Sequence, residues 1–135
     1  MIDIENDIFT EVASAIREKF PKAYVTGEYV RTPPSFPCVS ITERDNYPYK
    51  RTMDSSSMER HAVLMYEINV YSNKQSGKKT ECREIAKVID DTFSRFGFYR
   101  RMLNTVPNLD DATIYRIIGR YQAVVDDKKT VYRSK

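Results

Sequence analysis

The sequence predicts an α+β fold in which an antiparallel or mixed β-sheet carries two helices on one face. Two segments, one near the N-terminus and one past the middle of the chain, have the apolar spacing of amphipathic helices. Around them lie runs in which apolar and polar residues alternate, joined by turns. Strands that follow one another through turns favour antiparallel pairing, and the two helices then pack on one face of the sheet.

The first helix is expected over residues 3–20. Apolar residues recur there every four positions, at Ile4, Ile8, Val12 and Ile16. Asp3 is placed to cap the start of this helix, and Pro21 ends it. Residues 23–30 then predict a strand interrupted by Gly27, and a proline-bearing connector, 31–37, leads to a short strand at 38–42.

Residues 43–60 are the least core-like part of the chain, because they are polar and show no sustained period. They predict either a long loop or an extended, weakly paired hairpin. Loops of this length are uncommon in compact domains and often make contacts. We therefore expect a contact loop at about 44–58, with Tyr47, Tyr49, Lys50 and Arg51 as its candidate interface residues.

The second half of the chain predicts a long strand, a helix and further strands. Residues 61–71 alternate, with Ala62, Leu64, Tyr66, Ile68 and Val70 on one face. A helix is expected over 78–96, with Gly97 at its C-terminal cap. Strands follow at 98–107, at 112–126 and, after a turn, at 130–133. On the strand 112–126, Arg116 and Arg120 share one face.

Length and charge limit the possible functions. The 135 residues fit one domain, 1–135. The 22 basic and 19 acidic residues give a net charge of +3, which is less than the basic surplus of a dedicated nucleic-acid binder. Basic pairs recur at Lys50-Arg51, Lys78-Lys79, Arg100-Arg101 and Lys128-Lys129. Because most of them lie near acidic residues, a solvated surface is favoured over a DNA footprint.

Cysteine content and hydropathy add two expectations. Cys38 and Cys82 stand far apart without a CxxC pair or a Cys/His cluster, so neither zinc nor a disulfide framework is indicated. Reduced, partly buried thiols in a cytosolic setting account for them. The N-terminus lacks a signal pattern, and no apolar run approaches about 18 residues, so we expect a soluble protein without a membrane partner.

A predicted strand, the residues Gly77-Lys78-Lys79-Thr80 and a predicted helix follow one another, in the order found around phosphate-binding loops. The P-loop motif needs a glycine five positions before the second glycine and a hydroxyl directly after the lysine. Ser72 stands at the first position, and Lys79 stands where the hydroxyl belongs. A turn that leads into a helix accounts for this stretch, and no nucleotide cofactor is expected.

Acid–base and metal chemistry are not favoured either. The pairs Asp90-Asp91, Asp110-Asp111 and Asp126-Asp127 suggest a metal site, but adjacent side chains diverge on a strand or a helix. Aspartates at strand ends commonly form turns. His61, the single histidine, has no carboxylate–nucleophile constellation nearby. We therefore expect no enzyme activity, no metal and no cofactor.

A pattern spread over nearly the whole chain carries a family resemblance. After the N-terminal helix come FPCVSITE, ERHAVLMYEINVYSN, GKKTECREIAKVIDDTF, GFYRR, VPNLDDATIYRIIGRYQAVVD and VYR. In order and spacing, these segments resemble the small tail-terminator proteins of long-tailed bacteriophages, also called tail-completion or minor capsid proteins. Head–tail connector and head-completion proteins of similar size and composition are the alternative.

The resemblance implies an α+β subunit of a ring, generally six-fold, that caps the finished tail tube and ends its polymerisation. The implied partners are further copies of the chain, the tail tube protein and the head–tail connector proteins, while DNA passes through the ring without sequence-specific contact. The implied location is the neck of the virion, after assembly in the host cytoplasm.

In such a ring Arg100, Arg101, Arg116 and Arg120 are further candidate interface residues. Arg116 and Arg120 would be intersubunit ion-pair donors or would line the lumen, and a solvated strand face is the alternative for both. Two other classes of function stay open: a small DNA-associated module that uses the scattered basic pairs, and a metal-dependent hydrolase built on the aspartates.

Overall fold

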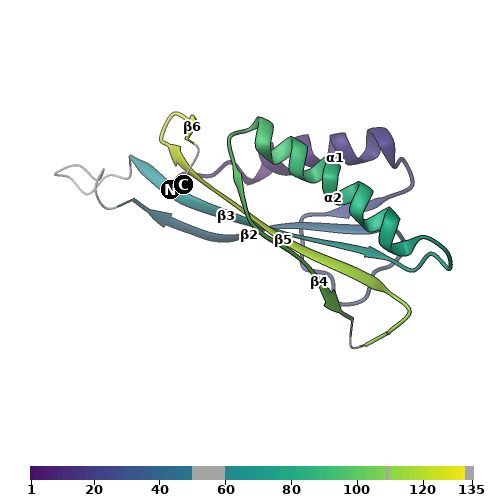
Figure 1. Ribbon diagram of the computed structural model, residues 1–135. Coiled ribbons are helices and arrows are strands. Elements are labelled where there is room, and N and C mark those ends of the chain that lie inside the picture. The colour runs from purple at the N-terminus through teal and green to yellow at the C-terminus, as the bar shows by residue number, and fades with distance from the viewer. Residues whose placement is uncertain (50–59, 109, 133–135) are drawn as a thin grey trace.

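Within the described residues, two helices cover one face of a mixed six-stranded sheet (Figure 1). The computed structural model describes residues 1–49, 60–108 and 110–132. The elements follow the order α1 (Glu5–Lys19), β1 (Tyr24–Thr26), β2 (Cys38–Pro48), β3 (His61–Ser72), α2 (Lys78–Arg95), β4 (Tyr99–Pro107), β5 (Tyr115–Asp126) and β6 (Val131–Tyr132). The predicted α+β class is thus confirmed.

The sheet has the order β1-β2-β3-β5-β4, and β6 pairs with β5. β1 runs parallel to β2, and all other neighbours are antiparallel. The three long strands pair closely in register, so that Val39, Val70 and Ile117 lie in one row across the sheet. Because side chains alternate between faces along a strand, each row places its members on the same side.

Helix α1 packs its apolar stripe on the sheet. Ile8, Val12 and Ile16 are all buried, as the spacing of four predicted. The carboxylate of Asp3 accepts a hydrogen bond from the backbone N–H of Glu5 at 3.0 Å, although Ile4 occupies the cap position itself. Asp3 therefore supports the first turn from one residue farther out than predicted.

Helix α2 ends where Gly97 was predicted to cap it. Gly97 has φ +87°, a left-handed conformation that residues with a Cβ rarely adopt. Its N–H bonds to the Ser94 carbonyl at 3.0 Å, and the N–H of Phe98 returns to the Phe93 carbonyl at 3.0 Å. This reversal brings Phe98 back into the core beside Phe93, with ring centroids 5.4 Å apart.

The centre of the core is aromatic and carries two buried tyrosines. The Phe93 ring of α2 stacks on Tyr121 of β5, with centroids 4.5 Å apart. The Tyr121 hydroxyl donates to Asp90 at 2.8 Å, and the Tyr66 hydroxyl donates to Glu43 at 3.2 Å. Both phenols therefore bury their rings while the hydroxyl finds a carboxylate, the arrangement that buried tyrosines need.

Two of the predicted strands are shorter than expected. The first strand covers only Tyr24–Thr26 instead of 23–30, because the chain turns after Thr26, whose hydroxyl accepts the N–H of Glu28 at 3.3 Å. β5 begins at Tyr115 instead of residue 112. Asp111 forms a turn there, in which its carboxylate accepts the N–H and the hydroxyl of Thr113 at 2.9 and 2.6 Å.

The strand predicted at 38–42 is longer than expected. β2 continues to Pro48 and pairs with β3 along its whole length, with an irregularity in register between Glu43 and Asp45. The hairpin alternative for residues 43–60 is therefore correct as far as Pro48. Polar residues can extend a strand when the partner strand offers backbone groups, which an apolar pattern does not reveal.

Neither of the two helices, α1 and α2, has the length and apolar character that crossing a lipid bilayer requires.

Candidate functional site

The face of the sheet opposite the helices is the candidate interaction surface, and we call it the helix-free face. Alternate residues of β3 point toward the helices, and among them Leu64, Tyr66 and Ile68 are fully buried. The intervening positions, and those paired with them in neighbouring strands, form the helix-free face. Its central residues are Thr42, Asp45, Tyr47, Met65, Glu67, Asn69, Tyr99, Met102, Arg116, Ile118, Arg120 and Gln122.

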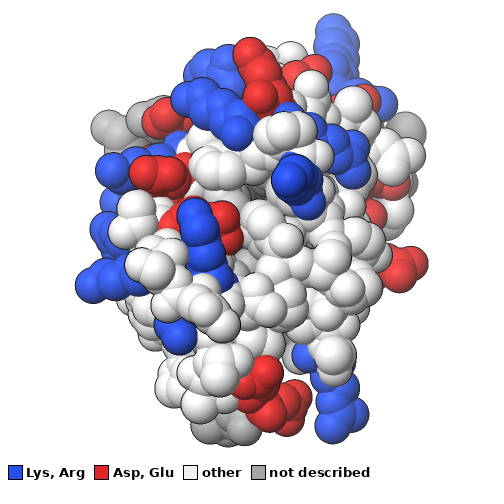
Figure 2. Space-filling model, turned by 90° about the vertical axis from the view of Figure 1, so that its right-hand side faces the viewer, with Lys and Arg blue, Asp and Glu red and all other residues white. Residues whose placement is uncertain are grey.

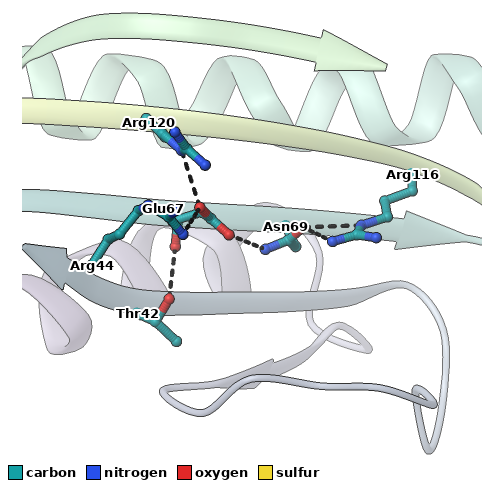
Figure 3. A network of polar contacts seen from close by, with 6 residues as sticks. All are labelled: Thr42, Arg44, Glu67, Asn69, Arg116 and Arg120. Carbon is teal, nitrogen blue, oxygen red and sulfur yellow. Dashed lines mark hydrogen bonds and ion pairs between the residues drawn. The ribbon is translucent and has the colours of Figure 1, made fainter. Parts of the chain in front are cut away.

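Glu67 of β3 organises the middle of this face (Figure 3). One oxygen of its carboxylate, Oε2, accepts the Nε–H of Arg120 at 3.1 Å and a guanidinium N–H of Arg44 at 3.2 Å. Thr42 donates to the Glu67 carbonyl oxygen at 3.5 Å. The Glu67 side chain is only 12% exposed, whereas Arg120 is 31% and Arg44 48% exposed. One largely buried carboxylate thus holds two guanidinium groups that reach solvent.

Arg116 is held by a different kind of partner. Its Nε and Nη2 both donate to the side-chain oxygen of Asn69, at 3.0 and 2.7 Å (Figure 3). The amide nitrogen of Asn69 donates to Glu67 Oε1 at 3.4 Å, which fixes the orientation of the amide. The Arg116 guanidinium also lies 5.4 Å from the centroid of the Tyr71 ring. A neutral amide therefore positions Arg116, and no carboxylate among the described residues forms an ion pair with it.

The predicted pair Arg100-Arg101 is divided between two faces. Arg100 pairs with Tyr121 in the ladder and reaches α2, where it forms an ion pair with Asp90 at 3.2 Å. The register of β4 against β5 shifts between Arg100 and Met102, so Arg101 occupies the extra position. Arg101 donates to the Tyr99 hydroxyl at 2.8 Å. Arg101 therefore belongs with the helix-free face and Arg100 with the helix layer.

The contact-loop residues are only partly within the described chain. Tyr47 lies in β2 opposite Val63 and is 52% exposed. Tyr49 follows the strand, is 37% exposed, and its N–H bonds to the His61 carbonyl at 2.7 Å. Lys50 and Arg51 lie outside the described residues. Of the predicted set, the helix-free face thus brings together Tyr47, Arg101, Arg116 and Arg120.

Sequence reasoning missed the three residues that organise this face, Arg44, Glu67 and Asn69. A signal was present, because alternation in 61–71 places Glu67 and Asn69 on the face away from the core. Polar residues in the middle of a long strand, facing the side that carries Arg116 and Arg120 on another strand, are candidates for cross-strand pairs. The pairing of β3 with β5, which makes Glu67 face Arg120, could not be deduced from the sequence alone.

The other chemical candidates do not form a site within the described residues. There, no group of three or more His, Cys, Asp or Glu side chains lies close enough together to hold a metal ion. His61 packs against the ring of Tyr132, with centroids 5.8 Å apart. Burial raises the pKa of the Cys38 thiol to about 11 and that of Cys82 to about 12, so neither is a ready nucleophile.

The end of the molecule that carries the start of α2 shows no continuous basic patch in the view of Figure 2. Lys and Arg side chains are interspersed there with Asp and Glu, and the lower centre of the view is largely uncharged. Lys78, which follows Gly77 at the start of α2, donates to the carbonyl oxygen of Thr113 at 3.1 Å. These basic residues behave as a solvated surface.

Comparison of the sequence with protein-family models gave no match, and a search of curated proteins gave none either.

Proposed function

We propose that this chain is a structural virion protein that forms a ring on the end of a phage tail tube, stops tube polymerisation and provides the surface on which the head is joined. The resemblance to tail-terminator proteins suggests this function. The observation that carries it is the helix-free face, on which ordered arginines and the exposed Tyr47 lie on a sheet surface that neither α1 nor α2 covers.

The composition of this face suits a protein interface. Tyrosine, arginine and methionine are enriched at interface cores relative to the rest of a protein surface. The helix-free face combines half-buried Met65 and Met102 with Tyr47, Tyr99 and the arginines around Glu67. Half-buried apolar side chains can be covered further on assembly without first being exposed by a conformational change.

The fixed conformations of the arginine side chains favour assembly as well. Immobilising a long side chain at an interface costs roughly 0.5–1.5 kcal/mol. Arg116 and Arg120 are already held by Asn69 and Glu67, so much of this cost is met during folding. A rigid, pre-formed surface binds a partner with less loss of entropy than a mobile one.

A ring follows if the helix-free face of one copy contacts a different surface of the next. The helix layer lies on the opposite side of the sheet, so the two sides of the subunit present different chemistry (Figure 1). Contacts between unlike surfaces close into a ring when the rotation between copies is right. The further partners of the ring are the tail tube protein and the head–tail connector proteins, and DNA passes through it.

A head–tail connector or head-completion protein is the second candidate, because the same face could join copies at the head side of the neck. The two functions differ in what the ring binds. A tail terminator binds the ends of assembled tubes, whereas a connector binds the portal side of filled heads and leaves tubes unchanged.

Tube polymerisation with the tail tube protein of the same genome tests the proposal. We expect added protein to shorten the tubes and to appear as a ring at one end in negative-stain electron microscopy. Tyr47→Ala together with Arg101→Ala should weaken capping, whereas Arg17→Ala together with Lys19→Ala, on the exposed end of α1, should not. Tubes of unchanged length with bare ends would contradict the proposal.

A further inference from the structure

We infer that two copies of this chain pair through the outer side of β4 and form a two-fold dimer with one continuous sheet. The inference goes beyond the proposed function, because it concerns the free chain before it meets a tail tube. It uses backbone groups at the margin of the sheet and not the side chains of the helix-free face. It depends on the unpaired backbone of β4 and on the charges at the two ends of this strand.

β4 forms one margin of the sheet along its whole length. Within the described residues it pairs on one side only, with β5, over Tyr99–Pro107. Helix α2 contacts β3 and β5 as well as β4, so it lies over the middle of the sheet. At the opposite margin, in contrast, β2 is shielded in part by β1 and by Ile2, whose carbonyl accepts the side-chain amide of Asn46 at 2.8 Å. The outer side of β4 is therefore the longer edge that another strand can reach.

Alternation along the strands identifies the open backbone groups. β6 lies on the same side of β5 as β4, because β3 pairs with β5 on the other side. The N–H of Asp126 bonds toward this side, at 2.9 Å to the turn before β6, so every second residue of β5 from Asp126 backward directs its backbone groups toward β4. Ile118 is one of them and pairs with Asn104. The neighbours of Asn104, Leu103 and Thr105, therefore direct their N–H and C=O groups to the outer side.

These outward backbone groups have no partner in the described part of the chain. Outside the ladder with β5, no hydrogen bond there involves the backbone of Leu103 or Thr105. A row of unpaired groups at a sheet edge is a template for another strand, and edge strands usually prevent such pairing with charges, prolines or bulges. In β4 the irregularity in register and Pro107 lie at the ends, and the middle, residues 102–106, carries neither a charge nor a proline.

A second copy of β4 is the partner that fits this edge. In antiparallel pairing about a two-fold axis at Asn104, Leu103 of each copy lies opposite Thr105 of the other. Each such pair exchanges two backbone hydrogen bonds, and the symmetry repeats the contact. Pairing at an edge extends the sheet and covers neither of its faces. The helix-free faces of both copies therefore stay available for the contacts proposed for the ring.

The charges at the two ends of β4 favour this antiparallel arrangement. Arg100, at the start of the strand, is 51% exposed and uses only Nη1 in its bond to Asp90. Asp110 lies just past the end of the strand, is exposed, and its carboxylate has no partner among the described residues. Antiparallel pairing brings each Arg100 toward the Asp110 of the other copy. Parallel pairing would place the two Arg100 side chains next to each other, and like charges in that position destabilise a sheet.

Sedimentation equilibrium of the intact chain between about 1 µM and 1 mM tests the dimer, since contacts of small area dissociate in this range. We expect twice the mass of the 15.8-kDa chain at the highest concentrations. Amide hydrogen exchange should slow at Leu103 and Thr105 as the dimer forms, and change less at Asn104, which already pairs with β5. A chain that stays monomeric throughout, or a dimer that leaves the exchange of both outward amides unchanged, would overturn the inference.

Thr105→Pro removes one outward N–H from each copy and should weaken the dimer by about tenfold or more, because two backbone hydrogen bonds are lost. Proline is tolerated on an edge strand where the N–H faces solvent, so the fold should persist. Thr105→Val is the matched control. It also lacks the hydroxyl that bonds to Tyr115 at 2.7 Å, but it keeps the N–H and should dimerise like the wild type. Equal dissociation constants for the two variants would contradict the inference.

Asp110→Lys tests the charges at the ends of the strand. It places a cation near Arg100 of the other copy and should weaken the dimer by about threefold or more, with a smaller effect at high salt. Glu84→Lys, on the exposed side of α2, changes the net charge equally and should leave the dissociation constant unchanged. Equal effects of the two substitutions would contradict the antiparallel arrangement.

Tube capping by the same proteins separates this inference from the proposed function. A monomeric Thr105→Pro chain that still caps tubes supports the inference, because the outer side of β4 then serves the dimer and not the ring. Capping by a wild-type chain that never dimerises overturns the inference and leaves the proposed function standing. A dimer that depends on the Thr105 N–H, without capping of tubes, supports the inference and contradicts the proposed function.

Discussion

Glu67 and Arg120 face each other directly across β3 and β5, and the carboxylate accepts the Nε–H of the guanidinium at 3.1 Å. The same carboxylate oxygen also holds Arg44 from β2. One acidic side chain therefore ties together three strands on the face that the helices leave uncovered. The proposed interface depends on this arrangement.

Glu67→Gln should destabilise the fold by about 1.5–3 kcal/mol, the range for hydrogen bonds to charged groups. Glutamine keeps the size of the side chain but leaves Arg44 and Arg120 without a counter-charge. Urea denaturation measures the change in the free energy of unfolding. Glu11→Gln on the exposed side of α1 is the matched control and should stay within about 0.5 kcal/mol of wild type. Equal stability of the two variants would show that Glu67 does not hold the strands together.

Gly119→Ala tests how closely β5 packs against the side chains opposite it, Leu103 of β4 and Ile68 of β3. A Cβ at this position would lie 2.9 Å from Leu103 Cδ1 and 3.2 Å from Ile68 Cδ1. Overpacking of this kind costs roughly 1–3 kcal/mol, and we expect thermal unfolding to show it as a lower Tm.

Leu103→Ala in the Gly119→Ala background gives the rescue experiment. Leu103 is half-buried on the edge strand, so its truncation removes the closest contact at a modest cost. We expect a double-mutant cycle to show a favourable coupling between the two changes. Strictly additive losses would mean that Ile68, and not Leu103, resists the added methyl group.

Ile85→Asp should abolish soluble folding. Ile85 is fully buried on the face of α2 that packs on the sheet, and an ionised carboxylate has no partner there. Ile85→Val, which leaves only a small cavity, should cost about 0.5–1.5 kcal/mol and keep the protein soluble. Soluble yield and the circular dichroism melting curve check both variants. A wild-type melting curve for Ile85→Asp would mean that this side of α2 faces solvent.

The pH dependence of stability should reveal the environment of Glu43. Burial raises the pKa of this carboxyl above 4.5, and Glu5 and Asp3 raise it further, against the lowering effect of hydrogen bonds from Asn46 and Tyr66. A group with a raised pKa in the folded state favours folding when protonated. Its contribution is fully present below the unfolded-state pKa and is lost as the pH rises through the folded-state pKa.

Glu43→Gln should therefore raise the Tm at pH 7 modestly, because glutamine still accepts the Tyr66 hydroxyl but carries no charge. The gain over wild type should disappear below pH 4.5. Melting curves across this range measure the difference. A gain that stays constant with pH would mean that the charge of Glu43 has no effect on stability.

The long elements of this fold could be predicted from the sequence, and the arrangement of the polar face could not. The four-residue repeat of Ile8, Val12 and Ile16 and the alternation from Ala62 to Val70 each follow from burial on one side. In contrast, β2 extends to Pro48 through polar residues, because its pairing depends on backbone groups of β3. The contact between Arg116 and Asn69 could not be predicted either, because the two residues are 47 positions apart in the sequence.

The candidate site, too, could be predicted from the sequence only in part. Alternation correctly placed Arg116 and Arg120 together on one face of a strand. Which of Arg100 and Arg101 lies on the helix-free face depends on the register of β4, and no residue pattern in β4 predicts its irregularity between Arg100 and Met102. Neighbouring basic residues on a strand point to opposite faces in a regular ladder, and the shift decides which of them joins the helix-free face.

We propose above all that copies of this chain assemble into a ring on a tail tube. Native mass spectrometry and electron microscopy of the protein mixed with tubes of the same genome measure this most directly. We predict a closed ring at the tube end, of six copies of the 15.8-kDa chain. A protein that stays monomeric at every concentration and leaves the tube ends bare would contradict the claim.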